Sequence, residues 1–164
     1  MKLLLEERGA EVVITEEVIN AVATSGQESV LHIISTHPMM LSYQEKWLAI
    51  AQFYKAAELG NKRKIQSLLE RGVEPDLPNP RKVTPLCIAA TNGHIEVVRL
   101  LLETKSVNVN ATSVSGRSSI FRAAANGYEE IVRLLLNAGA DPTFIDTNGD
   151  TALLVSKKYG FRSV

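Results

Sequence analysis

The sequence predicts an all-α fold in which a pair of short helices is repeated along the chain, and three observations support this. Glycines that can end a helix recur at intervals of 34, 33, 34 and 33 residues. Small or apolar residues precede the first four, and branched apolar residues at helical spacing follow them. Each helix has about three turns and cannot bury its apolar face alone, so each unit needs neighbours. The glycines are Gly26, Gly60, Gly93, Gly127 and Gly160.

The repeated unit is clearest between Thr84 and Leu102. Thr84 can cap the first helix through its hydroxyl, and Pro85 occupies the first helical position, where a missing N–H costs nothing. Gly93 supplies the left-handed residue that ends this helix. Apolar residues at three- and four-residue spacing then continue on a second helix. The stretch therefore predicts two short helices that run back to back.

Three stretches carry a resemblance to a known family: TPLCIAATNGHIEVVRLLL, SSIFRAAANGYEEIVRLLLNAGADP and DTNGDTALLVSKKYG. They resemble ankyrin repeats, from about Trp47 to Gly160. The resemblance implies a solenoid of helix–turn–helix units whose short β-hairpin loops project from one edge. It also implies that the hairpin tips and the exposed face of the first helices form a concave, protein-binding surface. We therefore expect degenerate helical repeats without hairpins over residues 1–46, and ankyrin repeats over 47–164 with an incomplete last repeat.

The first 46 residues are less regular than the rest. Residues 1–9 resemble the end of a second helix whose first helix is missing, and Thr15 is placed to cap the next helix. Gln27 to Ser35 is predicted as the returning helix, which Pro38 ends. The segment MKLLLEERGAEVVITEEVINAVA is also similar to a repeat in the C-terminal arrays of fungal NACHT-type STAND proteins, which are intracellular sensors of the NOD-like class.

A long helix is predicted next, from Tyr43 to Leu59, with Trp47 as a packing anchor. Three later loops, 76–83, 109–117 and 141–150, carry hairpin-like sequences. The family's D-x-x-G-x-T pattern is intact in the third loop and partly kept in the second. In the first loop Lys82 replaces the glycine, and prolines stiffen the chain, so we expect that hairpin to be irregular.

Composition narrows the possible functions. The 18 basic and 18 acidic residues give no net charge, which argues against general affinity for nucleic acid or anionic membranes. The single cysteine, Cys87, excludes an internal disulfide and any multi-cysteine metal site, and it suits a reducing compartment. The apolar run near the N-terminus is too short for a signal peptide, and no stretch is long enough for a membrane span. We therefore expect a cytoplasmic location.

No catalytic motif occurs in the sequence, so we expect neither enzymatic activity nor a cofactor or metal. His94 follows a helix-ending glycine and is assigned a structural role. In ankyrin repeats the histidine of the T-P-L-H motif forms hydrogen bonds within and between repeats. The residues at this histidine position here are Tyr54, Cys87, Phe121 and Leu154. This predicts that the histidine's hydrogen bonds, the polar tie of the family, are replaced by apolar packing in every repeat.

The resemblance places a set of candidate protein-binding residues on the hairpin tips and first helices. Four of them are cations that would form a basic strip complementary to an acidic partner: Arg81, Lys82, Arg117 and Arg122. The others are Val83, Thr91, Asn92, Val114, Asn126 and Asn148.

The leading functional hypothesis is a non-catalytic protein-binding module that belongs to a larger intracellular sensor or scaffold protein. This hypothesis rests on the analogy between folds. The alternative is a structural spacer or a segment that self-associates end to end, which the predicted open ends of the array favour. An enzyme would need a pocket with paired titratable groups, and a nucleic-acid binder would show steep salt dependence.

Overall fold

The computed structural model describes residues 3–7, 10–14 and 41–161, with side chains from Leu48 onward. The chain divides into two compact units, Met1–Gln52 and Phe53–Val164. Of the segments analysed above, the expected helices around Thr15 and at 27–35 lie outside the described residues.

The first unit contains a two-stranded antiparallel sheet of β1 (Leu3–Glu7) and β2 (Ala10–Ile14), in which Leu3 lies opposite Ile14. The expectation of a helix end over residues 1–9 is therefore wrong for Leu3–Glu7. The physical reason is the partner strand: its β-branched Val12, Val13 and Ile14 favour an extended backbone, and they pair with the leucines of β1.

Helix α3 (Leu41–Glu58) crosses the boundary between the two units. It matches the long helix predicted from Tyr43 to Leu59 to within two residues at each end. The side chain of Trp47 lies outside the described residues, so its role as a packing anchor stays a prediction.

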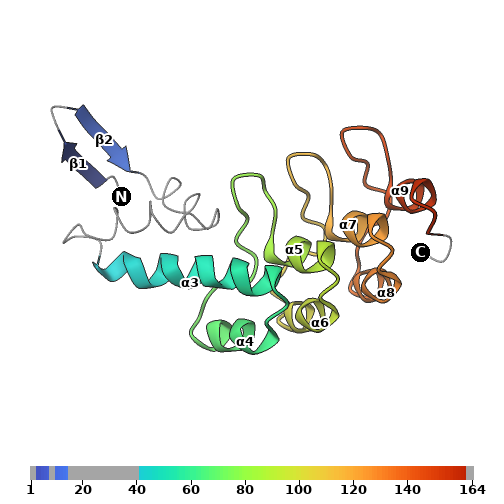
Figure 1. Cartoon of the computed structure of the whole chain (residues 1–164), viewed down its shortest axis with the longest axis horizontal. Coiled ribbons are helices and arrows are strands. Elements are labelled where there is room, and N and C mark those ends of the chain that lie inside the picture. The colour runs from blue at the N-terminus through green and yellow to red at the C-terminus, as the bar shows by residue number, and fades with distance from the viewer. Residues whose placement is uncertain (1–2, 8–9, 15–40, 162–164) are drawn as a thin grey trace. The chain divides into compact units, whose positions relative to one another are not determined.

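The second unit is the predicted all-α ankyrin solenoid. Its first helices α5, α7 and α9 form one row, its second helices α4, α6 and α8 form another, and the three loops project on one side (Figure 1). Neighbours contact one another along each row, α5 packs on α6, and α7 packs on α8. The helices are α4 (Lys62–Glu70), α5 (Pro85–Thr91), α6 (Ile95–Glu103), α7 (Ser119–Ala125), α8 (Glu129–Asn137) and α9 (Ala152–Lys158).

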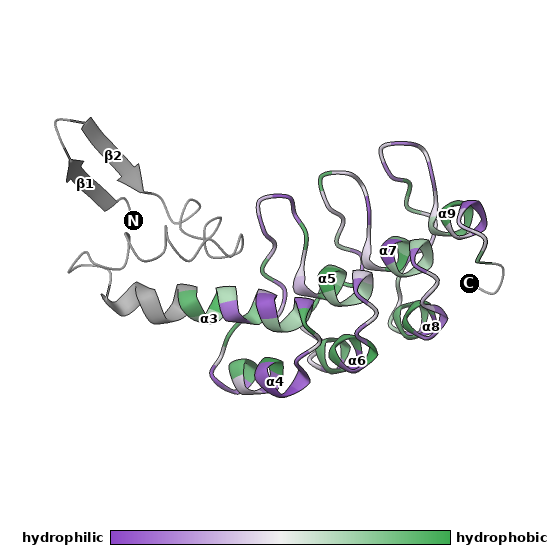
Figure 2. Cartoon of the chain, viewed as in Figure 1, coloured by the Kyte–Doolittle hydropathy of each residue, from purple (hydrophilic) through white to green (hydrophobic). Residues whose placement is uncertain are grey.

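A side-chain hydroxyl caps each of the first helices α5, α7 and α9, and the sequence predicts the one at Thr84. The Thr84 hydroxyl accepts a hydrogen bond from the Cys87 N–H, and Ser118 and Thr151 cap α7 and α9 in the same way. The core of each repeat combines small residues of the first helix with branched residues of the second, such as Ala89 and Leu101, which are fully buried. Hydrophobic residues accordingly dominate α6 and α8 (Figure 2).

An aromatic ring packs over the helix-ending glycine of the preceding repeat at each junction. His94 lies over Gly60, and a Cβ atom on that glycine would meet the His94 Nδ1 atom at 2.6 Å. Gly93 has the same relation to Tyr128, and Gly127 has it to Phe161. These glycines also have φ between +70° and +74°. The position thus requires glycine for its backbone conformation and for the close approach of the next repeat.

Candidate functional site

The three loop tips share one backbone geometry. In the first loop, the Asn79 N–H donates to the Val83 carbonyl (3.0 Å) and the Lys82 N–H donates to the Asn79 carbonyl (2.7 Å). The second and third loops repeat both bonds from Ser113 and Asp146. The fourth residue of each turn has positive φ: 55° at Lys82, 74° at Gly116 and 79° at Gly149.

The expectation that the first hairpin would be irregular is therefore wrong. Lys82 adopts the left-handed conformation that glycine adopts in the other loops, at a cost of about 1 kcal/mol or more. The Asn79 side chain offsets this cost, because its Oδ1 atom accepts the N–H groups of Arg81 and Val83, each at 3.0 Å. In the third loop, Asp146 accepts the N–H groups of Asn148 and Asp150 with the same atom.

Successive loops are hydrogen-bonded to one another. At the tips, the Val114 N–H donates to the Arg81 carbonyl (3.0 Å) and the Thr147 N–H donates to the Ser115 carbonyl (3.1 Å). Closer to the helices, the Asn108 N–H donates to Asp76 (2.9 Å). One repeat later the Asp141 N–H donates to Asn110 (2.8 Å). These bonds hold the tips in register, so the loops form one ordered edge.

Tyr54 anchors the first loop to the solenoid. Its hydroxyl donates to the Leu77 carbonyl, and it lies 3.0 Å from the Val83 carbonyl oxygen. Burial raises the pKa of Tyr54, and the nearby Cys87 and Asp76 raise it further, so the phenol stays protonated as a donor. The prediction that the polar tie is missing from every repeat is therefore wrong at Tyr54.

The other positions of that motif behave differently. The Cys87 Sγ atom lies 3.1 Å from the Ser119 Oγ atom in the core, and Phe121 is buried by apolar packing. Leu154 is exposed on α9. His94 has the structural role assigned to it: its Nε2 atom lies 2.7 Å from the Glu58 carbonyl oxygen and joins α6 to the preceding repeat.

Four candidate binding residues expose their side chains at the loop tips: Arg81, Lys82, Val114 and Asn148. Val83 is half-buried beside them. The candidates at the ends of the first helices instead donate to carbonyls of their own helix. The Thr91 hydroxyl donates to Cys87, and the Asn92 and Asn126 amides donate to Ile88 and Arg122. These three side chains therefore stabilise helix ends.

The expected basic strip is divided by a structural ion pair. The Arg117 Nε atom donates to the Asp146 Oδ2 atom (3.1 Å), and its guanidinium lies 5.4 Å from the Phe121 ring centroid. Burial acts to raise the pKa of Asp146, but the N–H groups of Asp150 and Asn148 and the Arg117 guanidinium together lower it. Arg117 thus joins the second loop to the third, and Arg81, Lys82 and Arg122 remain as cations without a carboxylate partner among residues 48–161.

The third loop carries two exposed apolar residues that the sequence reasoning missed, Phe144 and Ile145. Ile145 exposes 62% of its surface, as much as Val114 on the second loop. The available signal was an apolar pair in a loop whose other residues are polar, glycine or proline. The loop edge therefore presents apolar as well as cationic side chains.

Within the described part of the chain, no three His, Cys, Asp or Glu side chains gather as possible metal ligands. None of the helices described there is both long enough and apolar enough to cross a membrane.

Comparison with known proteins supports one family over most of the second unit. Residues 53–146 match the family model for ankyrin repeats in three copies. Residues 3–28 match a domain of unknown function (DUF7104). The similarity of this segment to STAND repeats therefore stays a prediction.

Several curated proteins are similar to the chain over part of their length. Human transient receptor potential cation channel subfamily A member 1 is 32% identical over 53% of this chain and 8% of its own length. Mouse ankyrin repeat and SAM domain-containing protein 6 is 36% identical over 61% of this chain and 11% of its own length. The mouse B-cell lymphoma 3 protein homolog is 32% identical over 66% of this chain and 24% of its own length. The chain thus spans less than a quarter of the length of these relatives. With the helix rows, the hydrogen-bonded loops and the family match in agreement, the chain belongs to the ankyrin-repeat family.

Proposed function

We propose that residues 53–161 form a non-catalytic module that binds another protein through the loop tips and the adjacent exposed side of the first helices. Ankyrin repeats are protein–protein interaction modules, and the loop edge supports this use here. The observation that carries the proposal is the register of the tips, which backbone hydrogen bonds fix from Arg81 to Val114 and from Ser115 to Thr147. An edge ordered in advance loses little conformational entropy when it binds.

The chemistry of this edge favours a partner with both acidic and apolar groups. Arg81 and Lys82 are exposed cations on the first loop, while Val114 and Ile145 are exposed apolar residues on the next two. Exposed apolar side chains held on a fixed backbone are suitable anchors at an interface, and the cations add electrostatic complementarity.

The module belongs, in this proposal, to a larger intracellular sensor or scaffold protein that works in the cytoplasm. The support is the share of each relative that this chain covers, which ranges from 8% to 24%. Any activity would then reside in other parts of the protein.

Affinity capture from lysate of the source organism, read by mass spectrometry, tests the binding edge. The wild-type chain is compared with the tip variant Arg81→Glu/Lys82→Glu/Ile145→Asp. Arg117 is left unchanged, because reversing its charge would break the Asp146 ion pair. The matched control is Arg63→Glu/Lys64→Glu, which reverses the charges of the exposed Arg63 and the half-buried Lys64 on α4, in the row of second helices.

A partner that the wild type and the control retain and the tip variant loses supports the proposal, provided that circular dichroism shows equal helix content. Retention of the same proteins by all three chains contradicts it. In that case the second candidate function, a structural spacer or a self-associating segment, would be favoured. Its signature is a sedimentation coefficient that rises with protein concentration.

A further inference from the structure

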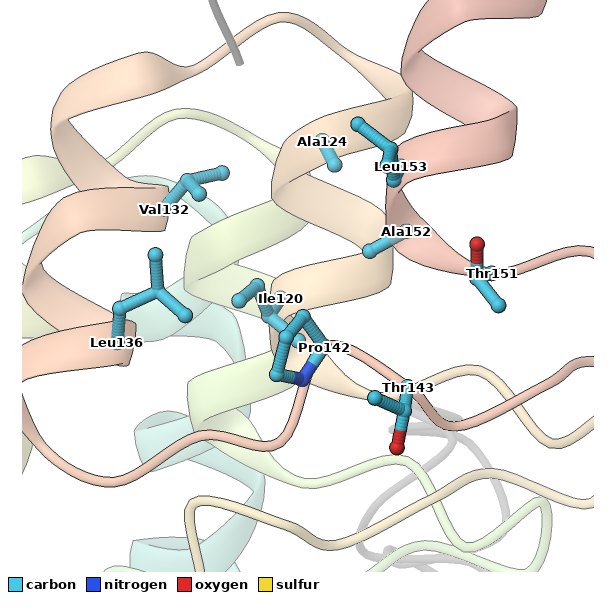
Figure 3. A pocket seen from close by; sticks show the side chains of 9 residues that line it. All are labelled: Ile120, Ala124, Val132, Leu136, Pro142, Thr143, Thr151, Ala152 and Leu153. Carbon is cyan, nitrogen blue, oxygen red and sulfur yellow. The ribbon is translucent and has the colours of Figure 1, made fainter.

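Arg122 of α7 is turned away from the core of its own repeat. Ile120 and Ala124 of the same helix line an apolar pocket together with residues of α8 and α9 (Figure 3). Arg122 is two residues from each of them in the sequence, which is about 200° around an α-helix. Its side chain therefore leaves α7 on the side that faces away from this pocket.

Arg122 is a cation in the middle of the row of first helices. Helix α7 contacts both α5 and α9, and the equivalent residues on those helices are apolar, Ile88 and Val155. An asparagine amide four residues later donates to the Ile88 carbonyl (3.0 Å) and, in the next repeat, to the Arg122 carbonyl (2.9 Å). Ile88 and Arg122 therefore share one backbone setting and differ in the half-buried side chain that each presents.

The guanidinium of Arg122 is partly enclosed by the protein. Its Nε atom is buried and has no hydrogen-bond acceptor among residues 48–161. Its Nη atoms are neither buried in this way nor bonded within those residues, so they meet solvent. A side chain held in this way loses less conformational entropy and less hydration on binding than a freely moving cation does. Arg122 is thus prepared to bind a planar anion end-on through its Nη atoms.

The carboxylates of the third loop do not neutralise Arg122, because each has its own cation. Asp146 accepts from Arg117 (3.1 Å), and Asp150 accepts from Lys158 (2.6 Å). The positive charge of Arg122 is therefore uncompensated among residues 48–161, and it is complementary to a carboxylate on a partner.

We propose that Arg122 selects an Asp or Glu side chain of a partner protein, and that an apolar residue of the same partner segment contacts Ile88. This inference rests on the proposed function, because it assigns the partner's chemistry at the same face. The carboxylate binds the Arg122 Nη atoms through charge-assisted hydrogen bonds. Packed helices lie about 8–10 Å apart, which an extended segment spans in about three residues. The partner segment therefore has its acidic and apolar residues about three positions apart.

Selection from a phage-displayed library of short random peptides tests this assignment. The full chain is the bait, and the same library is selected on Arg122→Met and on the control Arg63→Met, which removes an exposed cation from α4. We expect the wild type and the control to enrich peptides with Asp or Glu about three residues from an apolar residue. Arg122→Met should enrich peptides without a fixed acidic position, because methionine fills similar space without the charge.

Fluorescence anisotropy then measures the affinity of one selected peptide. Replacing its Asp or Glu by the amide should weaken binding to the wild type by about tenfold or more and should change binding to Arg122→Met much less. Arg122→Lys keeps the charge but not the planar guanidinium, so it should recover only part of the affinity. If Arg122 served only as a cation near the end of α7, lysine would replace it fully and the peptide's acidic group would not matter.

The outcomes separate this assignment from the proposed function. Enrichment of the same acidic position on Arg122→Met would overturn the assignment and leave the proposed function intact. Failure of the wild type to enrich any peptide would count against both. If the wild type selects no acidic position and Arg122→Met lowers the melting temperature while Arg122→Lys does not, the carboxylate belongs to this chain, and the choice of a separate partner is overturned.

Discussion

The junction between the first and second loops and the junction between the second and third loops have different side chains at the equivalent position, Asp76 in the first and Asn110 in the second. At the second junction, the Asn110 Oδ1 atom accepts the Asp141 N–H (2.8 Å) while its Nδ2 atom donates to the Gly139 carbonyl (3.1 Å). At the first, the Asp76 Oδ2 atom accepts the Asn108 N–H (2.9 Å), but its Oδ1 atom is buried without a protein partner among residues 48–161. A carboxylate supplies only half of what an amide supplies here, because it accepts and cannot donate.

This difference appears in the ionisation of Asp76. Burial raises the pKa of this carboxyl, and the bond from the Asn108 N–H opposes the shift. The comparison shows that a repeat can keep its backbone geometry while one junction is less well satisfied than the next.

Asn110→Asp should have the largest effect, because it converts the better junction into the poorer one. It removes the bond to the Gly139 carbonyl and places a carboxylate oxygen beside that carbonyl, so we expect the free energy of unfolding to fall by about 2 kcal/mol. Urea denaturation measures the change. The control is Asn61→Asp, whose side chain only accepts a hydrogen bond as the cap of α4. Equal losses in both variants would refute the distinction.

Asp76→Asn makes the reverse exchange and should stabilise the solenoid by about 1 kcal/mol, since it removes a partly buried charge and gives the side chain a group that can donate in place of the unpartnered oxygen. Urea denaturation at pH 7 gives the value. The double variant Asp76→Asn/Asn110→Asp should give the sum of the two single effects if the junctions are independent. A loss of stability in the single variant would mean that the Asp76 Oδ1 atom already has a partner.

The gain from Asp76→Asn should disappear in acid. The folded state binds the Asp76 proton more tightly than the unfolded chain does, so the wild type gains stability relative to the variant as pH falls from 7 toward about 4. The pKa of Asp146 is shifted in the opposite direction, so its contribution to stability depends on pH with the opposite sign. Its lowered pKa gives stability above the ordinary pKa of an aspartate, and this stability is lost as pH falls through the folded value. Unfolding curves of wild type, Asp76→Asn and Asp146→Asn across this pH range test both dependences. A stability gain from Asp76→Asn that did not change with pH would contradict the expectation for Asp76.

Lys82→Gly should have the smallest effect and compares the first loop with the third. Glycine removes the cost of a left-handed lysine but adds freedom to the unfolded chain, so we expect a net gain of about 0.5 kcal/mol. Lys82→Ala is the control, because alanine keeps a Cβ atom and should give no gain. Thermal denaturation that ranks alanine with glycine would show that the positive φ is not the cause.

The regular parts of the fold were predictable because they rest on local chemistry. A glycine period, hydroxyl caps at Thr84 and Ser118, and apolar spacing each specify a helix boundary or face without knowledge of distant residues. The turn at Lys82 was not predictable from its own residue type, because the side chain of Asn79 decides it. The strand at Leu3–Glu7 was missed because its pairing with β2 outweighs a leucine-rich pattern that also fits a helix.

The site was predictable only in outline. Sequence reasoning placed Arg81, Lys82 and Val114 on exposed tips, and the structure agrees on their exposure. It could not foresee that Arg117 bonds to Asp146, because the two residues come from different repeats. The Tyr54 hydroxyl was overlooked for a related reason: its acceptors lie on a loop more than 20 residues away.

The ring over each glycine has a consequence for how such a chain changes length. Each junction consists of a glycine from one repeat and an aromatic ring, His94, Tyr128 or Phe161, from the next. Deleting residues 94–127 would bring Tyr128 directly after Gly93, with its ring at the place where His94 faces Gly60. Recombination between repeats therefore yields a junction of the same kind, and the array can gain or lose whole units while its stacking rule is preserved.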